Sequence, residues 1–270
     1  MPSFWRTSGL ALLCLAFTDS RVSADSESLY RRLKLSVGYD YSSGTYGTSD
    51  TTEIMYVPLT ATLEIGRWSL QSTIPYLRIS GPAGFVQGPN GPIQTTSGES
   101  DGLGDIVLRG SYFLPALTNW MPFIELIGRV KFPSANRSAG LGTGEYDAGV
   151  ETELSWALFP RFTPFVDGGY RYLGSPPGFE LDNVFVGTVG GTYRLLDVLN
   201  IGLLLDYQQA ASSTTGERLE LVPYATWKID DHWSLDVYTS AGLASGSPDV
   251  GVGVHIGYAV SGFSLFTGRP

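Results

Sequence analysis

The stretch YDAGVETELSWAL, residues 146–158, alternates apolar and polar side chains along most of its length. Tyr146, Val150 and Trp156 fall on one side of this alternation, and Glu151 and Glu153 fall on the other. A period of two is that of a β-strand, in which successive side chains point to opposite faces of a sheet. The stretch therefore predicts a strand with one apolar face and one charged face.

The same alternation recurs along most of the chain. It predicts about twelve strands, near residues 33–41, 53–65, 68–79, 104–114, 122–132, 146–158, 162–173, 181–195, 198–209, 217–229, 233–243 and 249–260. Only the segment 181–195 is ambiguous, because Val184 and Val186 compete with Phe185, Val189 and Tyr193 for the apolar face. The sequence thus predicts an all-β protein, and its 34 glycines and 15 tyrosines agree with this class.

The connections between these strands alternate in length. Short turns are expected at 66–67, 159–161, 196–197 and 230–232. Longer connections rich in Gly, Ser, Pro and Thr are expected at 42–50, 80–100, 134–143, 174–179, 211–216 and 244–248. The connection 115–121 departs from the pattern, since it is long where a short turn is expected.

Short turns on one side, longer loops on the other and an even strand number are typical of bacterial outer-membrane barrels. We therefore expect an antiparallel transmembrane β-barrel of about 12 strands with short periplasmic turns and longer extracellular loops. The expected location is the outer membrane of a Gram-negative bacterium, with its lipid as one partner and a monomer as the assembly.

A soluble β-sandwich is the alternative, because its strands also alternate between two faces. In a sandwich the apolar face would form the core and the charged face would meet water. Long strands, alternating loop lengths and aromatic residues near strand ends favour the membrane barrel, with Trp68, Trp156 and Trp233 as examples.

The N-terminus predicts secretion. Arg6 precedes the apolar run 10–17, and the small-residue triplet Val22-Ser23-Ala24 closes it, which is the pattern of a signal peptide cleaved after residue 24. The barrel is then expected to occupy residues 25–270. The lone cysteine, Cys14, would be lost with the peptide, so no disulfide framework is expected.

The charge of the chain argues against one class of partner. Loss of Arg6, Arg21 and Asp19 from the 17 basic and 26 acidic residues leaves 15 and 25, a net charge of about −10. A protein this acidic is not expected to bind nucleic acid.

Two segments resemble a known family. They are Ser100–Ile106, SDGLGDI, and the region 128–150, which contains Lys131-Phe132-Pro133, the glycine-rich GLGTG and YDAGV. They are similar to segments of the outer-membrane family named after the MetA pathway of phenol degradation, whose members are described as transporters. The resemblance implies a barrel and a link to uptake of aromatic or hydrophobic compounds. Many outer-membrane barrels end on an aromatic residue, whereas here Phe266 is followed by four further residues.

If the apolar faces meet lipid, the polar faces must line the interior, because Arg or Lys facing lipid at mid-depth costs roughly 2–4 kcal/mol. The candidate lumen-lining residues are Asp105, Arg109, Glu125, Arg129, Lys131, Asp147, Glu151, Glu153, Asp206 and His255. Two interpretations stay open: a polar passage that attracts small solutes, or a plug of mutually satisfied salt bridges.

These features predict a channel or transporter for small solutes, with a closed structural or adhesion barrel acting through its loops as the alternative. An enzyme is not expected, since His232 lies in a predicted turn and His255, the one credible base, has no serine placed beside it. Two histidines without cysteine do not make an ordinary zinc site, and no cofactor is expected. The connection 80–100 is expected to be either a mobile surface loop or a gate over the mouth.

Overall fold

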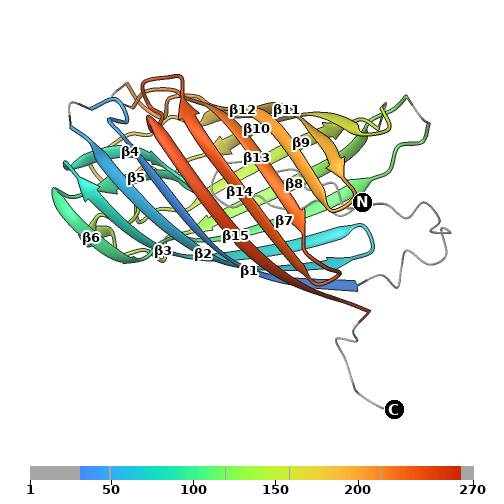
Figure 1. Ribbon diagram of the computed structural model, residues 1–270. Helices are drawn as coiled ribbons and strands as arrows, with labels where there is room; N and C mark the ends of the chain where they lie inside the picture. The colour runs from blue at the N-terminus through green and yellow to red at the C-terminus, as the bar shows by residue number, and fades with distance from the viewer. Residues whose placement is uncertain (1–30, 49, 119, 158, 214, 263–270) are drawn as a thin grey trace, which may run out of the picture.

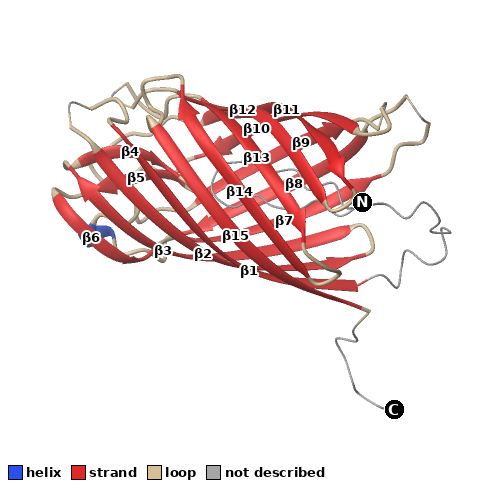
Figure 2. Cartoon of the chain, viewed as in Figure 1, coloured by secondary structure: helices blue, strands red, loops and turns tan. Residues whose placement is uncertain are grey.

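Twelve antiparallel strands form a closed cylinder in the computed structural model, which describes residues 31–262 except 49, 119, 158 and 214. Figures 1 and 2 show the cylinder from the side, with the start of β1 and the end of β15 at the same end of the barrel. The wall strands are β1 (Arg31–Gly44), β2 (Thr52–Ile65), β3 (Trp68–Gly81), β7 (Ile106–Leu114), β8 (Phe123–Phe132), β9 (Asp147–Ser155), β10 (Phe162–Tyr172), β11 (Val184–Leu196), β12 (Leu199–Gln208), β13 (Arg218–Lys228), β14 (Trp233–Gly242) and β15 (Val250–Ser261). The prediction of about twelve strands is confirmed, whereas the predicted signal peptide and Phe266 lie outside the described residues.

The first and last strands close the sheet. β1 pairs with β15 from Arg32 opposite Ser261 to Ser43 opposite Val250. The other wall strands pair antiparallel with their neighbours in chain order. Closure gives each wall strand two partners, so its backbone hydrogen bonds are satisfied within the protein, as lipid requires.

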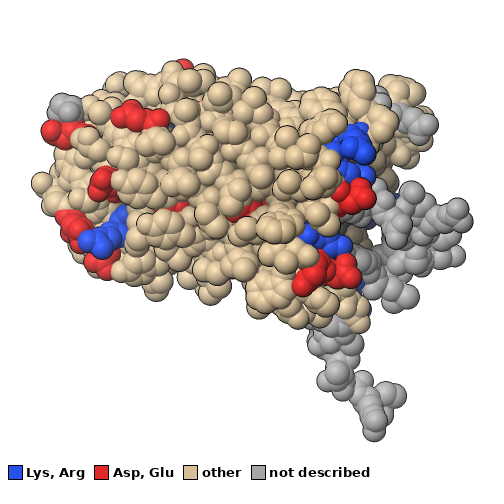
Figure 3. Space-filling view, viewed as in Figure 1, with Lys and Arg blue, Asp and Glu red and all other residues tan. Residues whose placement is uncertain are grey.

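The apolar face of the sheet points outward. On β1, Leu35, Val37 and Tyr39 are 46–50% exposed, whereas Lys34, Ser36 and Asp40, which alternate with them, are 5–6% exposed. In the space-filling view of Figure 3, charged side chains gather toward the two ends of the barrel, and the band between them is almost free of charge at its surface. A soluble sandwich would bury the apolar face, so this orientation rules out that alternative and places the band in the hydrocarbon core of a membrane.

Substitution of Leu203, near the middle of the outer face of β12, tests this orientation. Leu203 is 49% exposed, and arginine there would meet acyl chains at mid-depth. We expect Leu203→Arg to lower the free energy of unfolding by roughly 2–4 kcal/mol in urea titrations of vesicle-embedded protein. Leu196→Arg, at the turn end of β11, is the matched control with an expected loss of about 1 kcal/mol or less. Equal small effects at both positions would contradict a lipid-facing outer wall.

The connections alternate in length as expected. β2 and β3, β11 and β12, and β13 and β14 are joined by short turns at the end of the barrel where β1 begins and β15 ends. The opposite end carries the longer connections, among them 133–146 with the single-turn helix η2 (Arg137–Ala139). Among the described residues, no helix is long and apolar enough to cross a membrane.

The longest connection is not a plain surface loop. Residues 80–100 contain the hairpin β4 (Gly84–Gly88) and β5 (Gly91–Thr95), and they lead into β6 (Gly98–Leu103). Pro89 and Asn90 form the hairpin turn, where proline suits the first central position and Gly91 adopts a φ of 124°. β6 extends the wall toward the extracellular side. It pairs with the C-terminal half of β3, Tyr76–Gly81, whereas β7 pairs with the N-terminal half, Trp68–Thr73.

The β4–β5 hairpin lies inside the barrel at its extracellular end. On one side Phe85 packs with Leu173, Val184, Val186 and neighbouring residues from the β10–β12 region of the wall. On the other side Val86 and Ile93 pack with Ile54, Tyr56, Leu77 and Ile79, which point inward from β2 and β3. Since both faces of the hairpin are covered, the expectation of a mobile surface loop is wrong, and the alternative of a gate agrees better with this position.

This packing explains the ambiguous strand. Val184 and Val186 are buried and pack in one cluster with Phe85 of the hairpin, whereas Phe185, Val189 and Tyr193 are exposed on the lipid side. β11 is apolar on both faces near its extracellular end because one face meets lipid and the other meets a protein element. Inward-facing apolar residues in a barrel strand are therefore the sequence signal of an internal plug.

Candidate functional site

The tip of the hairpin reaches the interior wall at two points. Asn90 Nδ2 donates a hydrogen bond of 2.8 Å to the Tyr56 hydroxyl on β2. Arg129 Nη2 on β8 donates a hydrogen bond of 2.8 Å to the Asn90 carbonyl oxygen. Farther along the hairpin, Gln208 Nε2 on β12 donates to Gln87 Oε1 at 2.6 Å. Polar contacts thus tie the hairpin to opposite parts of the wall.

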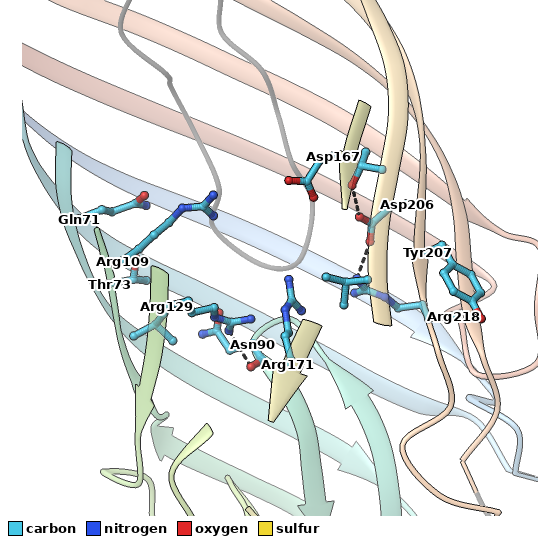
Figure 4. A pocket seen from close by; sticks show the side chains of 13 residues that line it. Gln71, Thr73, Asn90, Arg109, Arg129, Asp167, Arg171, Asp206, Tyr207 and Arg218 are labelled. Atoms are coloured by element: carbon cyan, nitrogen blue, oxygen red, sulfur yellow. Dashed lines mark hydrogen bonds and ion pairs between the residues drawn. The ribbon is translucent and has the colours of Figure 1, made fainter. Parts of the chain in front are cut away.

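A polar cavity lies beside the hairpin tip within the lumen (Figure 4). Its lining includes four arginines and two aspartates, so positive charge predominates. The lining residues are Gln71, Thr73, Asn90, Val107, Arg109, Arg129, Asp167, Arg171, Val186, Thr188, Asp206, Tyr207 and Arg218. In Figure 4, Arg109, Arg129 and Arg171 extend into this space from one side, and Asp167 and Asp206 lie across from them.

Three arginines on β7, β8 and β10 form what we call the arginine cluster: Arg109, Arg129 and Arg171. Arg171 binds Glu151 Oε1 through Nε at 3.0 Å and Nη2 at 2.8 Å. Arg109 Nη2 lies 3.8 Å from the second oxygen of the same carboxylate. Glu151 therefore holds two guanidinium groups side by side, while Arg129 is bound to the hairpin carbonyl.

The cluster is also coupled to the hairpin through Gln208. Arg171 Nη1 donates a hydrogen bond of 3.2 Å to Gln208 Oε1, and the amide of Gln208 binds Gln87. The positions of the arginines and of the hairpin consequently depend on one another.

Asp206 lies on the other side of the cavity and is already engaged. It accepts a hydrogen bond of 2.9 Å from Thr188 Oγ1 and forms an ion pair with Arg218. Its charge is therefore balanced by a neighbouring strand, and it holds β11, β12 and β13 together on the inner face.

Three other predicted residues form a buried cluster that supports the extracellular loops. Lys131 Nζ lies 2.7 Å from Asp147 Oδ2 and 3.4 Å from Asp105 Oδ2, and it donates to Thr143 Oγ1 at 3.2 Å. Asp105 accepts the Ala135 N–H, and Asp147 accepts the Gly174 N–H. The two segments that resemble the family, 100–106 and 128–150, thus contact each other through this cluster. Lys131 pairs with Asp105 and Asp147, so at this point the interior follows the interpretation of mutually satisfied salt bridges.

The remaining predicted residues, Glu125, Glu153 and His255, also lie on the inner face, but at other positions along or around the wall than the arginine cluster. Glu125 and Glu153 are opposite each other on β8 and β9, and both are buried. His255 Nε2 lies 2.6 Å from Asp40 Oδ1, which also accepts the Tyr238 hydroxyl at 2.6 Å. The structure therefore places the ten predicted residues on one surface but divides them among separate clusters.

Two important residues were missing from the predicted set. Arg171 follows the same period-two rule, because Tyr170 and Tyr172 beside it face lipid, so the sequence pattern could have found it. Asn90 carried no such signal, since it belongs to a connection whose path the strand pattern does not fix.

The described part of the chain offers no group of three or more metal-ligating side chains. The arrangement on the inner wall instead combines charged groups, amides and hydroxyls. Such a surface can attract, orient and pass a polar or charged solute.

A family model described as "Putative MetA-pathway of phenol degradation" matches residues 24–260. Among solved structures, an outer membrane channel from Pseudomonas putida F1 superposes with a TM-score of 0.63 at 15% identity, covering 89% of this chain and 100% of that one. The KdgM porin in complex with disordered oligogalacturonate superposes with a TM-score of 0.50 at 10% identity, covering 83% of this chain and 98% of that one. No curated protein sequence matches at a significant level. At these identities the two structures show a shared outer-membrane barrel fold.

Proposed function

Because the chain belongs to the family described by the MetA pathway of phenol degradation, we propose that it is a channel for small solutes, aromatic compounds among them. The protein is a twelve-stranded antiparallel barrel of the Gram-negative outer membrane. Residues 1–24 are its cleaved signal peptide in this proposal, residues 25–270 form the barrel, and the working unit is a monomer in outer-membrane lipid.

The observation that carries the proposal is the charged inner wall within an apolar cylinder. Arg109, Arg129 and Arg171 project into the lumen from β7, β8 and β10 (Figure 4). Glu151 on β9 is buried beside them and is paired with Arg109 and Arg171, whereas its neighbour Val150 is exposed on the lipid side. Charged groups inside a membrane are costly, and they typically mark the path of a solute or ion. The lumen candidates of the sequence are proposed to line this path.

In this proposal the protein lets a solute pass through its lumen and does not catalyse a reaction. His255 Nε2 is held by Asp40 Oδ1 at 2.6 Å, and the same carboxylate oxygen accepts the Tyr238 hydroxyl, so this group ties β1, β14 and β15 together. The solute would cross unchanged, guided by charge and hydrogen bonding on the wall.

Conductance of the purified barrel tests the proposed function. Residues 25–270, folded in detergent and added to planar lipid bilayers, are expected to give discrete conductance steps in KCl. Liposomes that contain the protein should take up a small polar solute such as arabinose faster than protein-free liposomes. A folded barrel that gives neither conductance nor uptake would overturn the proposal.

One observation favours a second function, that of a closed barrel acting through its loops. The β4–β5 hairpin and the Lys131 ion pairs occupy the extracellular part of the interior. A closed barrel would show no conductance, and deletion of residues 80–100 would abolish binding to its partner without opening a pore.

A further inference from the structure

We propose that the arginine cluster is a binding subsite for small carboxylates and makes the channel select anions over cations. This inference rests on the proposed function and names the class of solute that the cavity admits best. It concerns Arg109, Arg129 and Arg171, together with the hairpin tip at Asn90.

The sign of the charge around the cavity is the first argument. The whole chain carries a formal net charge of −9, yet the cavity lining contains four arginines against two aspartates. Asp206 is engaged by Arg218 and Thr188, so the three arginines of the cluster face Asp167 and the carboxylate of Glu151, which leaves an excess of one positive charge on that side. In a narrow lumen with low-dielectric walls, the field of this excess charge raises the local concentration of anions.

The bonding of Arg129 is the second argument. Its hydrogen bond within the described residues goes to the backbone carbonyl of Asn90, a neutral acceptor, and no described carboxylate lies within ion-pair distance of it. A guanidinium group has five N–H donors in a planar fork, so one such bond leaves donors for a solute. The fork geometry matches the two oxygens of a carboxylate.

The third argument is the spacing of the cations. Glu151 contacts Arg171 at 2.8 Å and Arg109 at 3.8 Å, which fixes both guanidinium groups next to the cavity. Arg109 and Arg129 are directly paired in the register of β7 and β8, so their side chains leave the wall at the same level. A carboxylate at this level would meet two guanidinium groups from adjacent strands.

Ion selectivity is the direct test. In planar bilayers with a KCl gradient, the reversal potential should show that chloride permeates better than potassium. Arg109→Gln and Arg129→Gln should each lower the ratio of chloride to potassium permeability about five-fold, since the interaction of an ion with one charge at about 4 Å changes the ion's occupancy by about that factor even in water. Arg78→Gln is the matched control, because it removes an equal charge from an exposed pair with Glu99 and should leave the ratio nearly unchanged.

Carboxylate recognition is tested separately from charge. Benzoate should reduce the chloride current of the wild-type channel in a concentration-dependent way, whereas benzyl alcohol, the neutral analogue, should not. Arg129→Lys keeps the charge but not the fork, so it should retain anion selectivity and lose at least half of the benzoate block.

The outcomes separate the two proposals. A conducting channel that prefers potassium, or one whose preference is unchanged in both glutamine variants, would overturn the subsite and leave the channel proposal intact. Equal block by benzoate in wild type and in both glutamine variants would also overturn it. A folded barrel that gives neither conductance nor solute uptake would instead overturn the proposed function itself.

Discussion

Replacement of residues 84–95 by a short Gly-Ser connection is expected to raise the single-channel conductance about five- to ten-fold. The β4–β5 hairpin fills the extracellular part of the lumen, where Phe85, Val86 and Ile93 pack against opposite sides of the wall. Its removal would leave a passage bounded by the wall strands alone. Single-channel recordings in symmetric KCl measure the change.

The control for this experiment keeps the hairpin in place. The same Gly-Ser sequence inserted at the exposed turn 230–232 should give wild-type conductance, because this turn lies at the opposite end of the barrel. Heat-modifiable migration on gels would show that both variants are folded barrels. Wild-type conductance in a folded hairpin deletion would contradict the assignment of the hairpin as the constriction.

Lys131→Met is expected to lower the free energy of unfolding by about 3–5 kcal/mol. Lys131 is 2% exposed and faces Asp147 at 2.7 Å and Asp105 at 3.4 Å, so its loss leaves two buried carboxylates without their shared cation. Urea titrations of the vesicle-embedded protein, followed by tryptophan fluorescence, measure the loss. The loop 133–146 should also become more sensitive to protease, because Asp105 and Thr143 are tied to this lysine.

Two variants make the lysine experiment decisive. Lys228→Met breaks an exposed pair with Asp231 and should cost about 1 kcal/mol or less, which controls for the loss of any lysine. Adding Asp147→Asn to Lys131→Met should recover part of the stability, because one uncompensated charge is then removed. A loss in Lys131→Met no larger than that in Lys228→Met would contradict the buried cluster.

Much of the fold could be predicted from local pattern. The alternation in 146–158 and 249–260 fixes which residues share a face, and the side-chain period of a strand leaves no other arrangement. The assignment of the apolar face to lipid followed from strand length, aromatic placement and loop alternation, and the exposed side chains of β1 confirm it.

The interior could be predicted only in part. The period-two rule places Arg109, Arg129 and Lys131 on the inner face, but it does not say which carboxylate each of them meets. Lys131 forms ion pairs with Asp105 and Asp147 in a buried cluster, whereas Arg109 and Arg129 line the cavity. These partners lie on different strands or in loops, so their pairing depends on register and on the paths of the connections.

By itself, the sequence determined that there are about twelve wall strands, which residues of each strand except 181–195 face lipid or the interior, and which end of the barrel carries the long connections, because all three depend on local periodicity and turn composition. Only the tertiary structure decided that residues 84–95 fold inward and that Arg109, Arg129 and Arg171 gather beside Asn90. The physical reason is that the hairpin is stabilised by contacts with wall residues remote in sequence, such as Ile54 and Val184. Those contacts exist only after the cylinder has closed.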